Sequence, residues 1–225
     1  LLREINAPHS LGNFYAAVTK ALGFKPARHE GKITGLAAYA DQDPKLLSEI
    51  QKMAFYKHDG SFFSPSIYGN YIKILKLAKK YGKEKISSVF QYILEDITSN
   101  YISYYVEKYN IENVVLAGGV FGNVKLNQKI HEINGVSNIH IFPHMADGGL
   151  GYGAAQFVYR EKTNDDSIAS IKDMYWGPEY SDDEIKESLS KYSVKYKYCD
   201  EIEKEIALYL SQGKVVTHFF GRMEF

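Results

Sequence analysis

The sequence has almost no cysteine and no excess of charge of either sign. Cys199 is the one cysteine among 225 residues, which excludes an internal disulfide. Lysine plus arginine and aspartate plus glutamate both number 27, so no basic surface for nucleic acid is indicated. No apolar run approaches the roughly 20 residues of a membrane span, and no signal peptide is visible. These absences predict a cytoplasmic protein with neither nucleic acid nor a membrane as partner.

Two common catalytic patterns are also missing. There is no Gly-x-Ser-x-Gly elbow of a nucleophilic hydrolase, and Cys199 has no histidine near it in the sequence. The Walker pattern, in which Gly-Lys-Ser/Thr follows a glycine after four residues, does not occur either. The sequence therefore argues against a hydrolase of this kind and against a P-loop kinase.

What the sequence does contain is a short apolar run that ends in two glycines. Residues 114–116 predict a strand, Gly118 and Gly119 follow, and a helix is predicted over residues 123–133. Backbone N–H groups at such a turn, together with the partial positive charge of a helix start, bind phosphate. We expect Gly119 to tolerate no side chain, because a phosphate approaches there and φ can be positive. A tight turn without a ligand uses the same pattern, so both interpretations stay open.

A second unit of the same kind follows about thirty residues later. Residues 138–142 predict a strand, Asp147 lies beyond its end, and Gly148 and Gly149 open a glycine-rich segment. Closely spaced glycines let a ligand approach the backbone, because no Cβ is in the way. Asp147 is therefore expected to face the group that the first glycine pair holds. Its alternative role is that of an N-cap for the following helix.

Four separated blocks of the sequence follow one another in a recognisable order. They read PHSLGNFYAAVTKALGF, HEGKITGLAAYAD, LAGGV-x-x-N-x-x-x-N and FP-x-x-x-DGG-x-x-x-GAA. In this order they resemble the O-carbamoyltransferases of nodulation-factor and antibiotic biosynthesis, over nearly the whole chain. That family is similar to the universal protein that makes threonylcarbamoyl-adenosine in tRNA, and both belong to the actin-like ATPase superfamily. The resemblance implies an α/β fold of this ribonuclease H-like class, a mixed sheet with helices on both faces, plus the start of a second α/β domain.

The resemblance also implies how the chain is divided. Residues 1–161 correspond to the C-terminal part of the actin-like carbamoyl-transfer domain, and the polar residues 162–172 are expected to be a linker. Residues 173–225 correspond to the beginning of the carbamoyl-adenylate-forming domain. In the family, a histidine-rich metal motif lies upstream, and GRMEF at residues 221–225 is the first half of a longer motif. The chain is therefore expected to be a fragment that is inactive alone.

The activity implied by the resemblance is transfer of a carbamoyl group from carbamoyl-adenylate, made from carbamoyl phosphate and ATP. The acceptor is a hydroxyl of a small molecule or sugar, and a homodimer is compatible with the family. The residues expected to bind the nucleotide are Lys32, Gly118, Gly119, Asn123, Gly148 and Gly149. Asp147 is the metal ligand that carries over, for a divalent metal that the resemblance indicates to be iron. Phe121 and Gly122 depart from the alanine and leucine that relatives more often have, which leaves the loop shape open.

Other interpretations remain beside this one. Lys32 reads either as a solvated loop charge or as a phosphate contact between two glycines. The same fold can also carry a nucleotide-dependent kinase or ATPase, or a non-catalytic nucleotide-binding domain.

Periodicity and turn signals predict the remaining elements. Helices are expected over residues 11–24, 44–56, 83–109 and 201–212, and from Ser181 onward, with a hairpin at 55–63 and a strand at 214–220.

Overall fold

The computed structural model describes residues 3–65, 70–165, 167, 171 and 173–224. The chain divides into two compact units, Leu1–Asp165 and Asp166–Phe225. This division lies inside the segment expected to be a linker, although Lys162 and Thr163 belong to the helix before it. Across the described ranges, no helix is both long enough and apolar enough to cross a membrane.

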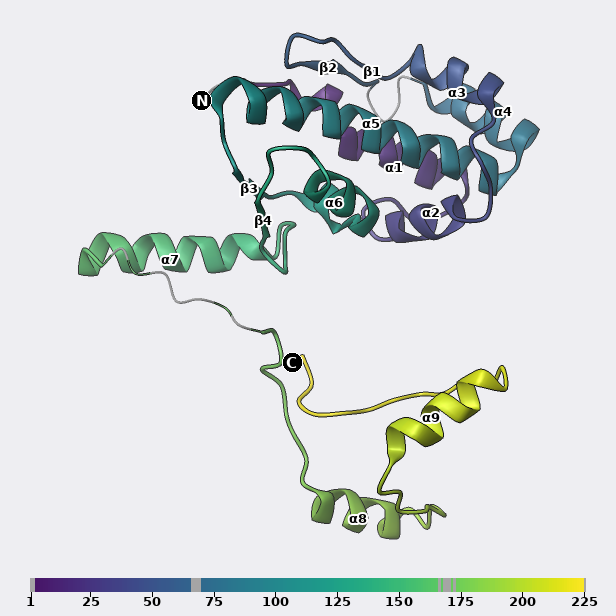
Figure 1. Ribbon diagram of the computed structural model, residues 1–225, viewed down its shortest axis with the longest axis vertical. Coiled ribbons are helices and arrows are strands. Elements are labelled where there is room, and N and C mark those ends of the chain that lie inside the picture. The colour runs from purple at the N-terminus through teal and green to yellow at the C-terminus, as the bar shows by residue number, and fades with distance from the viewer. Residues whose placement is uncertain (1–2, 66–69, 166, 168–170, 172, 225) are drawn as a thin grey trace. The chain divides into compact units, whose positions relative to one another are not determined.

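The first unit is built around one long helix, α5 (Lys83–Tyr109), whose bounds confirm the sequence prediction. Glycine at position 82, with φ at +87°, precedes the helix, and Asn110 ends it in the left-handed conformation. Helices that pack around α5 in Figure 1 include α1 (Leu11–Ala21), α2 (Glu30–Ala37), α3 (Pro44–Gln51) and α4 (Tyr71–Tyr81). The predicted helix over 44–56 therefore ends early, and α4 was not predicted.

The core of this unit lies between α5 and its neighbours. Phe14 of α1 stacks on Phe90 of α5 with ring centroids 4.5 Å apart, and both side chains are fully buried. Burial of each ring stabilises the fold by about 1.5 to 3 kcal/mol. The apolar stripe that predicted α5 is thus the surface on which the other helices assemble.

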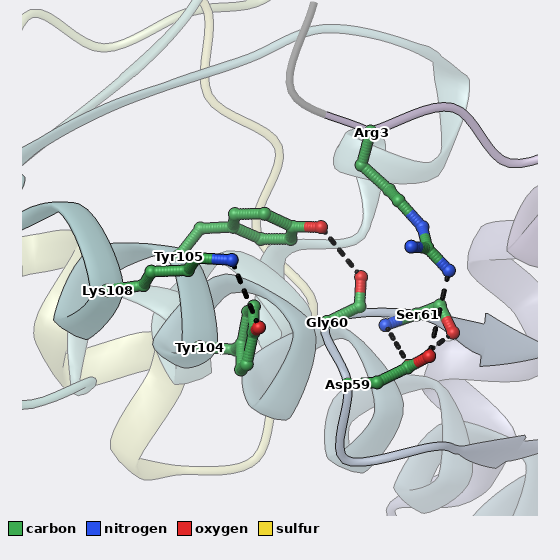
Figure 2. A network of polar contacts seen from close by, with 7 residues as sticks. All are labelled: Arg3, Asp59, Gly60, Ser61, Tyr104, Tyr105 and Lys108. Atoms are coloured by element: carbon green, nitrogen blue, oxygen red, sulfur yellow. Dashed lines mark hydrogen bonds and ion pairs between the residues drawn. The ribbon is translucent and has the colours of Figure 1, made fainter.

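A small hairpin is joined to the C-terminal half of α5. Strands β1 (Phe55–Tyr56) and β2 (Phe62–Phe63) pair antiparallel, which confirms the predicted hairpin. Figure 2 shows its turn: the Tyr105 hydroxyl donates to the Gly60 carbonyl at 2.8 Å, and the Ser61 N–H donates to the Asp59 carboxylate at 3.0 Å. Arg3 lies 3.8 Å from the same carboxylate. The turn is therefore held by three parts of the chain at once.

The strands that carry the glycine-rich segments form a parallel pair. Strand β3 (Asn113–Leu116) is followed by a 3₁₀ turn, η2 (Gly119–Gly122), then by α6 (Val124–His131) and by β4 (Asn138–Ile141). Helix α7 (Gly149–Thr163) follows β4. Because the strands are parallel, both glycine segments start at the same edge of the sheet.

The α/β class is confirmed, but the described residues form no mixed sheet of the predicted kind. The strands of the described ranges form two separate two-stranded sheets, β1–β2 and β3–β4. Leu116 is buried in the helical core, whereas Val115 on the opposite face is 75% exposed. Helix α7 buries none of its residues. In the described part of the chain, helices therefore cover one face of the parallel pair and not both.

The described residues of the second unit form helices α8 (Asp182–Lys191) and α9 (Ile202–Ser211). The capping box between Ser181 and Glu184 confirms the predicted start of α8. The predicted strand over residues 214–220 is wrong. Val215 is 95% exposed, and none of these residues pairs with another strand among residues 173–224. A strand needs a partner for its backbone groups, and apolar residues alone do not supply one.

Candidate functional site

The two glycine-rich segments lie against each other beyond the ends of β3 and β4. The Gly118 N–H donates to the Met145 carbonyl at 2.8 Å. The Met145 sulfur and the Ala146 methyl each lie 3.8 Å from where a Cβ would stand on Gly122 and Gly119. The carboxyl ends of parallel strands are where open α/β sheets bind ligands. We refer to residues 117–123 as the first loop and to residues 142–149 as the second loop.

In the first loop, the two glycines have different tasks. Gly118 adopts φ of +111°, which L side chains rarely reach, and its N–H is already bonded to the second loop. The positive φ considered for Gly119 is found at Gly118 and not at Gly119. The N–H groups of Gly119 and Val120 have no hydrogen-bond partner within the described ranges. They are donors that a ligand could use.

The second loop shows the same division of tasks. The Gly149 N–H donates to the Ala146 carbonyl at 3.0 Å, and a Cβ on Gly149 would stand 2.3 Å from the His144 carbonyl oxygen. A Cβ on Gly148 would overlap the His144 ring. The Gly148 N–H, in contrast, has no partner among the residues that the structure describes. Gly118 and Gly149 therefore shape the loops, while Gly119 and Gly148 present free donors.

Asp147 stands in the second loop with its side chain exposed. The N-cap of α7 is Gly148, with no side-chain cap bond, so Asp147 does not cap this helix. No hydrogen bond or ion pair reaches its carboxylate from the described residues. These residues also contain no group of three His, Cys, Asp or Glu side chains that could hold a metal. Asp147 can supply one ligand, but the described ranges do not complete a metal site.

Asn123 is the last residue of the first loop, and its side-chain amide is fully hydrogen-bonded within the protein. Its Oδ1 caps α6 by accepting from the Leu126 N–H at 3.1 Å, and it also accepts from Gln91 Nε2 at 3.1 Å. Its Nδ2 donates to Gln91 Oε1 at 2.8 Å and to Thr34 Oγ1 at 3.2 Å. An amide has two donor hydrogens, and both are engaged. In this structure Asn123 therefore supports the loop and has no free donor for the expected phosphate contact.

The contacts of Asn123 continue into a larger buried network. The Tyr15 hydroxyl donates to Gln91 Oε1 at 2.5 Å and lies 3.1 Å from Thr34 Oγ1. Burial raises the pKa of Tyr15 well above its usual value, so the hydroxyl keeps its proton and remains a donor. Sequence reasoning missed Tyr15, Thr34 and Gln91. The one available signal was a polar Gln91 inside the apolar stripe of a predicted helix.

Lys32 lies on helix α2 and not in a loop, which corrects the loop interpretation. Its side chain is exposed, and its Nζ lies 5.2 Å from the ring centroid of Phe24, beside Lys83 at 5.5 Å. To reach a phosphate at the glycine loops, the ammonium group must first leave this ring. The contact with a nucleotide stays a prediction.

A groove of about 500 Å³ runs between α5 and β3. Tyr101 and Val114 line it, and Phe121 connects it to the first loop. Thr98 also lines the groove, and its hydroxyl is buried without a hydrogen-bond partner in the described structure. A buried hydroxyl without a partner costs free energy, because it has lost its bonds to water.

We expect Thr98→Val to raise the free energy of unfolding by about 1 kcal/mol, since it removes the unpaired hydroxyl and keeps the shape. The matched control is Thr19→Val, because the Thr19 hydroxyl is equally buried but donates to the Tyr15 carbonyl at 3.0 Å. Urea unfolding of both variants measures the difference. If Thr98→Val destabilises the protein as much as Thr19→Val, the Thr98 hydroxyl has a partner and this account of it is wrong.

Comparison with known proteins identifies the family to which the residues of the site belong. Residues 2–156 match the family described as the carbamoyltransferase N-terminus. The matched range contains both glycine loops and the whole network around Asn123.

Three relatives illustrate the similarity. Two uncharacterized proteins of Methanocaldococcus jannaschii are 32% and 33% identical, and each alignment covers 96% of this chain. They are aligned over 37% and 43% of their own lengths. Nodulation protein NolO of Bradyrhizobium diazoefficiens is 26% identical over 96% of this chain and 41% of its own length. The chain thus spans about two fifths of the length of the relatives it matches.

Proposed function

Because the chain belongs to the carbamoyltransferase N-terminus family, we propose that it supplies the phosphate-binding part of an enzyme that carbamoylates a hydroxyl group. The proposed donor is carbamoyl-adenylate, formed from carbamoyl phosphate and ATP. The proposed acceptor is a small molecule or a sugar. The similarity to nodulation protein NolO is compatible with such an acceptor.

In the proposed reaction, the acceptor oxygen attacks the carbamoyl carbon and forms a new O–C bond. The bond between that carbon and the adenylate phosphate oxygen breaks, AMP leaves with the electron pair, and the hydroxyl proton passes to a base or to water. Negative charge grows on the phosphate as AMP leaves. Fixed N–H donors aimed at that charge stabilise the transition state more than the ground state.

The observation that carries the proposal is the set of free N–H groups on the two adjoining loops. Gly119, Val120 and Gly148 present donors without partners among the described residues, beyond the carboxyl ends of β3 and β4. The first turn of α6 follows directly and adds its partial positive charge. Donors of this kind suit a phosphate, and they favour it over a neutral ligand.

Asp147 and Lys32 each have one further proposed task. Asp147 contributes one ligand to a divalent metal, iron by resemblance, whose other ligands lie outside the described residues. Lys32 moves from Phe24 toward the phosphate as a point charge when the nucleotide binds. No step above depends on either group.

Gly119→Val in the full-length protein tests the phosphate site. A Cβ at Gly119 has room within the fold, since its nearest neighbour is the Ala146 methyl at 3.8 Å. We therefore expect the variant to fold and to bind ATP at least about tenfold more weakly. The valine side chain would keep a charged phosphate oxygen away from the Gly119 N–H. Calorimetry with ATP measures the affinity.

Gly151→Val is the control for this substitution, because Gly151 lies in α7 with open space around its Cβ position. An unchanged ATP affinity in a folded Gly119→Val protein would leave the first loop as a structural turn. Release of pyrophosphate from ATP that depends on carbamoyl phosphate supports the proposed donor. Phosphoryl transfer from ATP without carbamoyl phosphate would instead favour a kinase or ATPase.

A further inference from the structure

A buried chain of hydrogen bonds connects the first loop to three helices. Tyr15 of α1, Thr34 of α2 and Gln91 of α5 all bond to one another or to Asn123, which is the N-cap of α6. Gln91 is at the centre of this chain, and 6% of it is exposed. Its amide and that of Asn123 form a reciprocal pair, in which each donates to the other's oxygen.

The orientation of the Gln91 amide is set from outside the pair. Gln91 Nε2 also donates to Glu95 Oε1 at 2.7 Å. An ionised carboxylate can only accept, so the nitrogen of the Gln91 amide must face Glu95. Gln91 Oε1 then faces Tyr15 and the Asn123 nitrogen, and a flipped amide would lose its bonds to Glu95 and Asn123. The network therefore allows one arrangement of Asn123.

Asn123 transmits this arrangement to the loop through the backbone. Its N–H donates to the Val120 carbonyl at 3.2 Å. The Asn127 side chain, one turn further along α6, donates to the Phe121 carbonyl at 2.7 Å. The free N–H groups of Gly119 and Val120 thus lie within a few residues of a side chain that is held at four points.

We infer that Gln91 is a positioning residue that fixes the first loop through Asn123, so that the N–H groups of Gly119 and Val120 stay aimed at the phosphate of the bound nucleotide. The inference about the nucleotide rests on the proposed function. The inference about the loop does not, since it concerns contacts within this chain. The glycine pattern in the sequence does not indicate this role, because Gln91 lies 32 residues before Asn123 and meets it only in the folded chain.

The test uses Gln91→Met in the full-length protein, which keeps the length of the side chain and removes both the donor and the acceptor. Hydrogen exchange of residues 117–123, followed by mass spectrometry, is expected to rise by about tenfold, the change that one lost hydrogen bond produces. ATP affinity, measured well below the melting temperature, is expected to fall by a similar factor. Thr98→Val on the same helix is the control and should change neither quantity.

A second variant, Asn123→Asp, separates the role of Asn123 in positioning the loop from its role as the N-cap of α6. It also tests the inference if Gln91→Met does not fold. Aspartate caps a helix as well as asparagine does, but it has no N–H to donate to Gln91 or Thr34. We expect residues 124–131 to keep their protection while exchange in residues 117–123 increases. The position of the change along the chain is thus part of the expected result.

Two results would overturn the inference. The first is exchange in the loop that stays at the wild-type rate in both variants. The second is an increase spread evenly over residues 1–165, which would make Gln91 a general stabiliser of the unit. If the wild-type protein binds no ATP, the proposed function fails, while the exchange measurement still decides whether Gln91 positions the loop.

Discussion

Asp147→Asn in the full-length protein is expected to lose carbamoyl transfer by more than about 100-fold, together with the divalent metal that we propose it binds. Mutation of a residue that only supports a metal ligand lowers metal affinity or activity by about 10- to 100-fold. Loss of the ligand itself is expected to cost at least as much. The amide keeps the shape of the carboxylate but is a poorer ligand for a divalent cation. Metal content by mass spectrometry and a carbamoyl-transfer assay measure the two effects.

The melting temperature of Asp147→Asn without added metal is expected to equal that of the wild type. Asp147 is exposed, does not cap α7, and has no bond to the described residues that the substitution could break. Asp41→Asn is the matched control, because Asp41 is another exposed carboxylate without a bond in the described structure. Stoichiometric metal and near-normal transfer in Asp147→Asn would remove Asp147 from the metal site.

Gly60→Ala is expected to lower the free energy of unfolding by about 2 to 5 kcal/mol, from two separate causes. Gly60 has φ of +74°, which costs an L residue about 1 to 2 kcal/mol. An added Cβ would also stand 2.4 Å from a ring carbon of Tyr104, and relief of such overpacking costs about 1 to 3 kcal/mol more. As Figure 2 shows, the same turn receives the Tyr105 hydroxyl, so the hairpin cannot simply move away from α5.

Gly23→Ala isolates the backbone part of this effect. Gly23 has φ of +82°, but nothing lies within 4 Å of its Cβ position. We expect its substitution to cost only the backbone term, about 1 to 2 kcal/mol. Urea unfolding of the two variants gives the difference. If both variants lose the same free energy of unfolding, the Tyr104 ring moves to another rotamer without cost. The hairpin turn would then be loosely packed on α5.

Where local residues suffice, the sequence predicted the structure closely. Helix α5 has the predicted bounds because its apolar stripe recurs with the helical period, and residues directly at its ends stop it. The start of α8 was predicted because Ser181 and Glu184 cap it through groups three residues apart. The order of strand, glycines and helix around Gly118 and Gly149 was predicted for the same reason.

Where local signals conflict with packing, the sequence misled. Gly31 and Gly35 each weaken a helix by about 1 kcal/mol, so the residues around Lys32 read as a loop. Burial of Ile33 in the core overrides that weakness and keeps α2 helical. Residues 214–220 read as a strand because most of them are β-branched or aromatic, but no partner strand is present within residues 173–224.

The sequence by itself determined the family, the long helix α5 and the two glycine segments that approach each other. Only the tertiary structure decided which of their N–H groups are free, because Gly118 is engaged by Met145 and Gly149 by Ala146. It also decided that Asn123 supports the loop, through Thr34 and Gln91, which lie 89 and 32 residues earlier. Helical periods and caps are set by neighbours a few residues apart, whereas a hydrogen-bond partner across such distances exists only once the helices have packed.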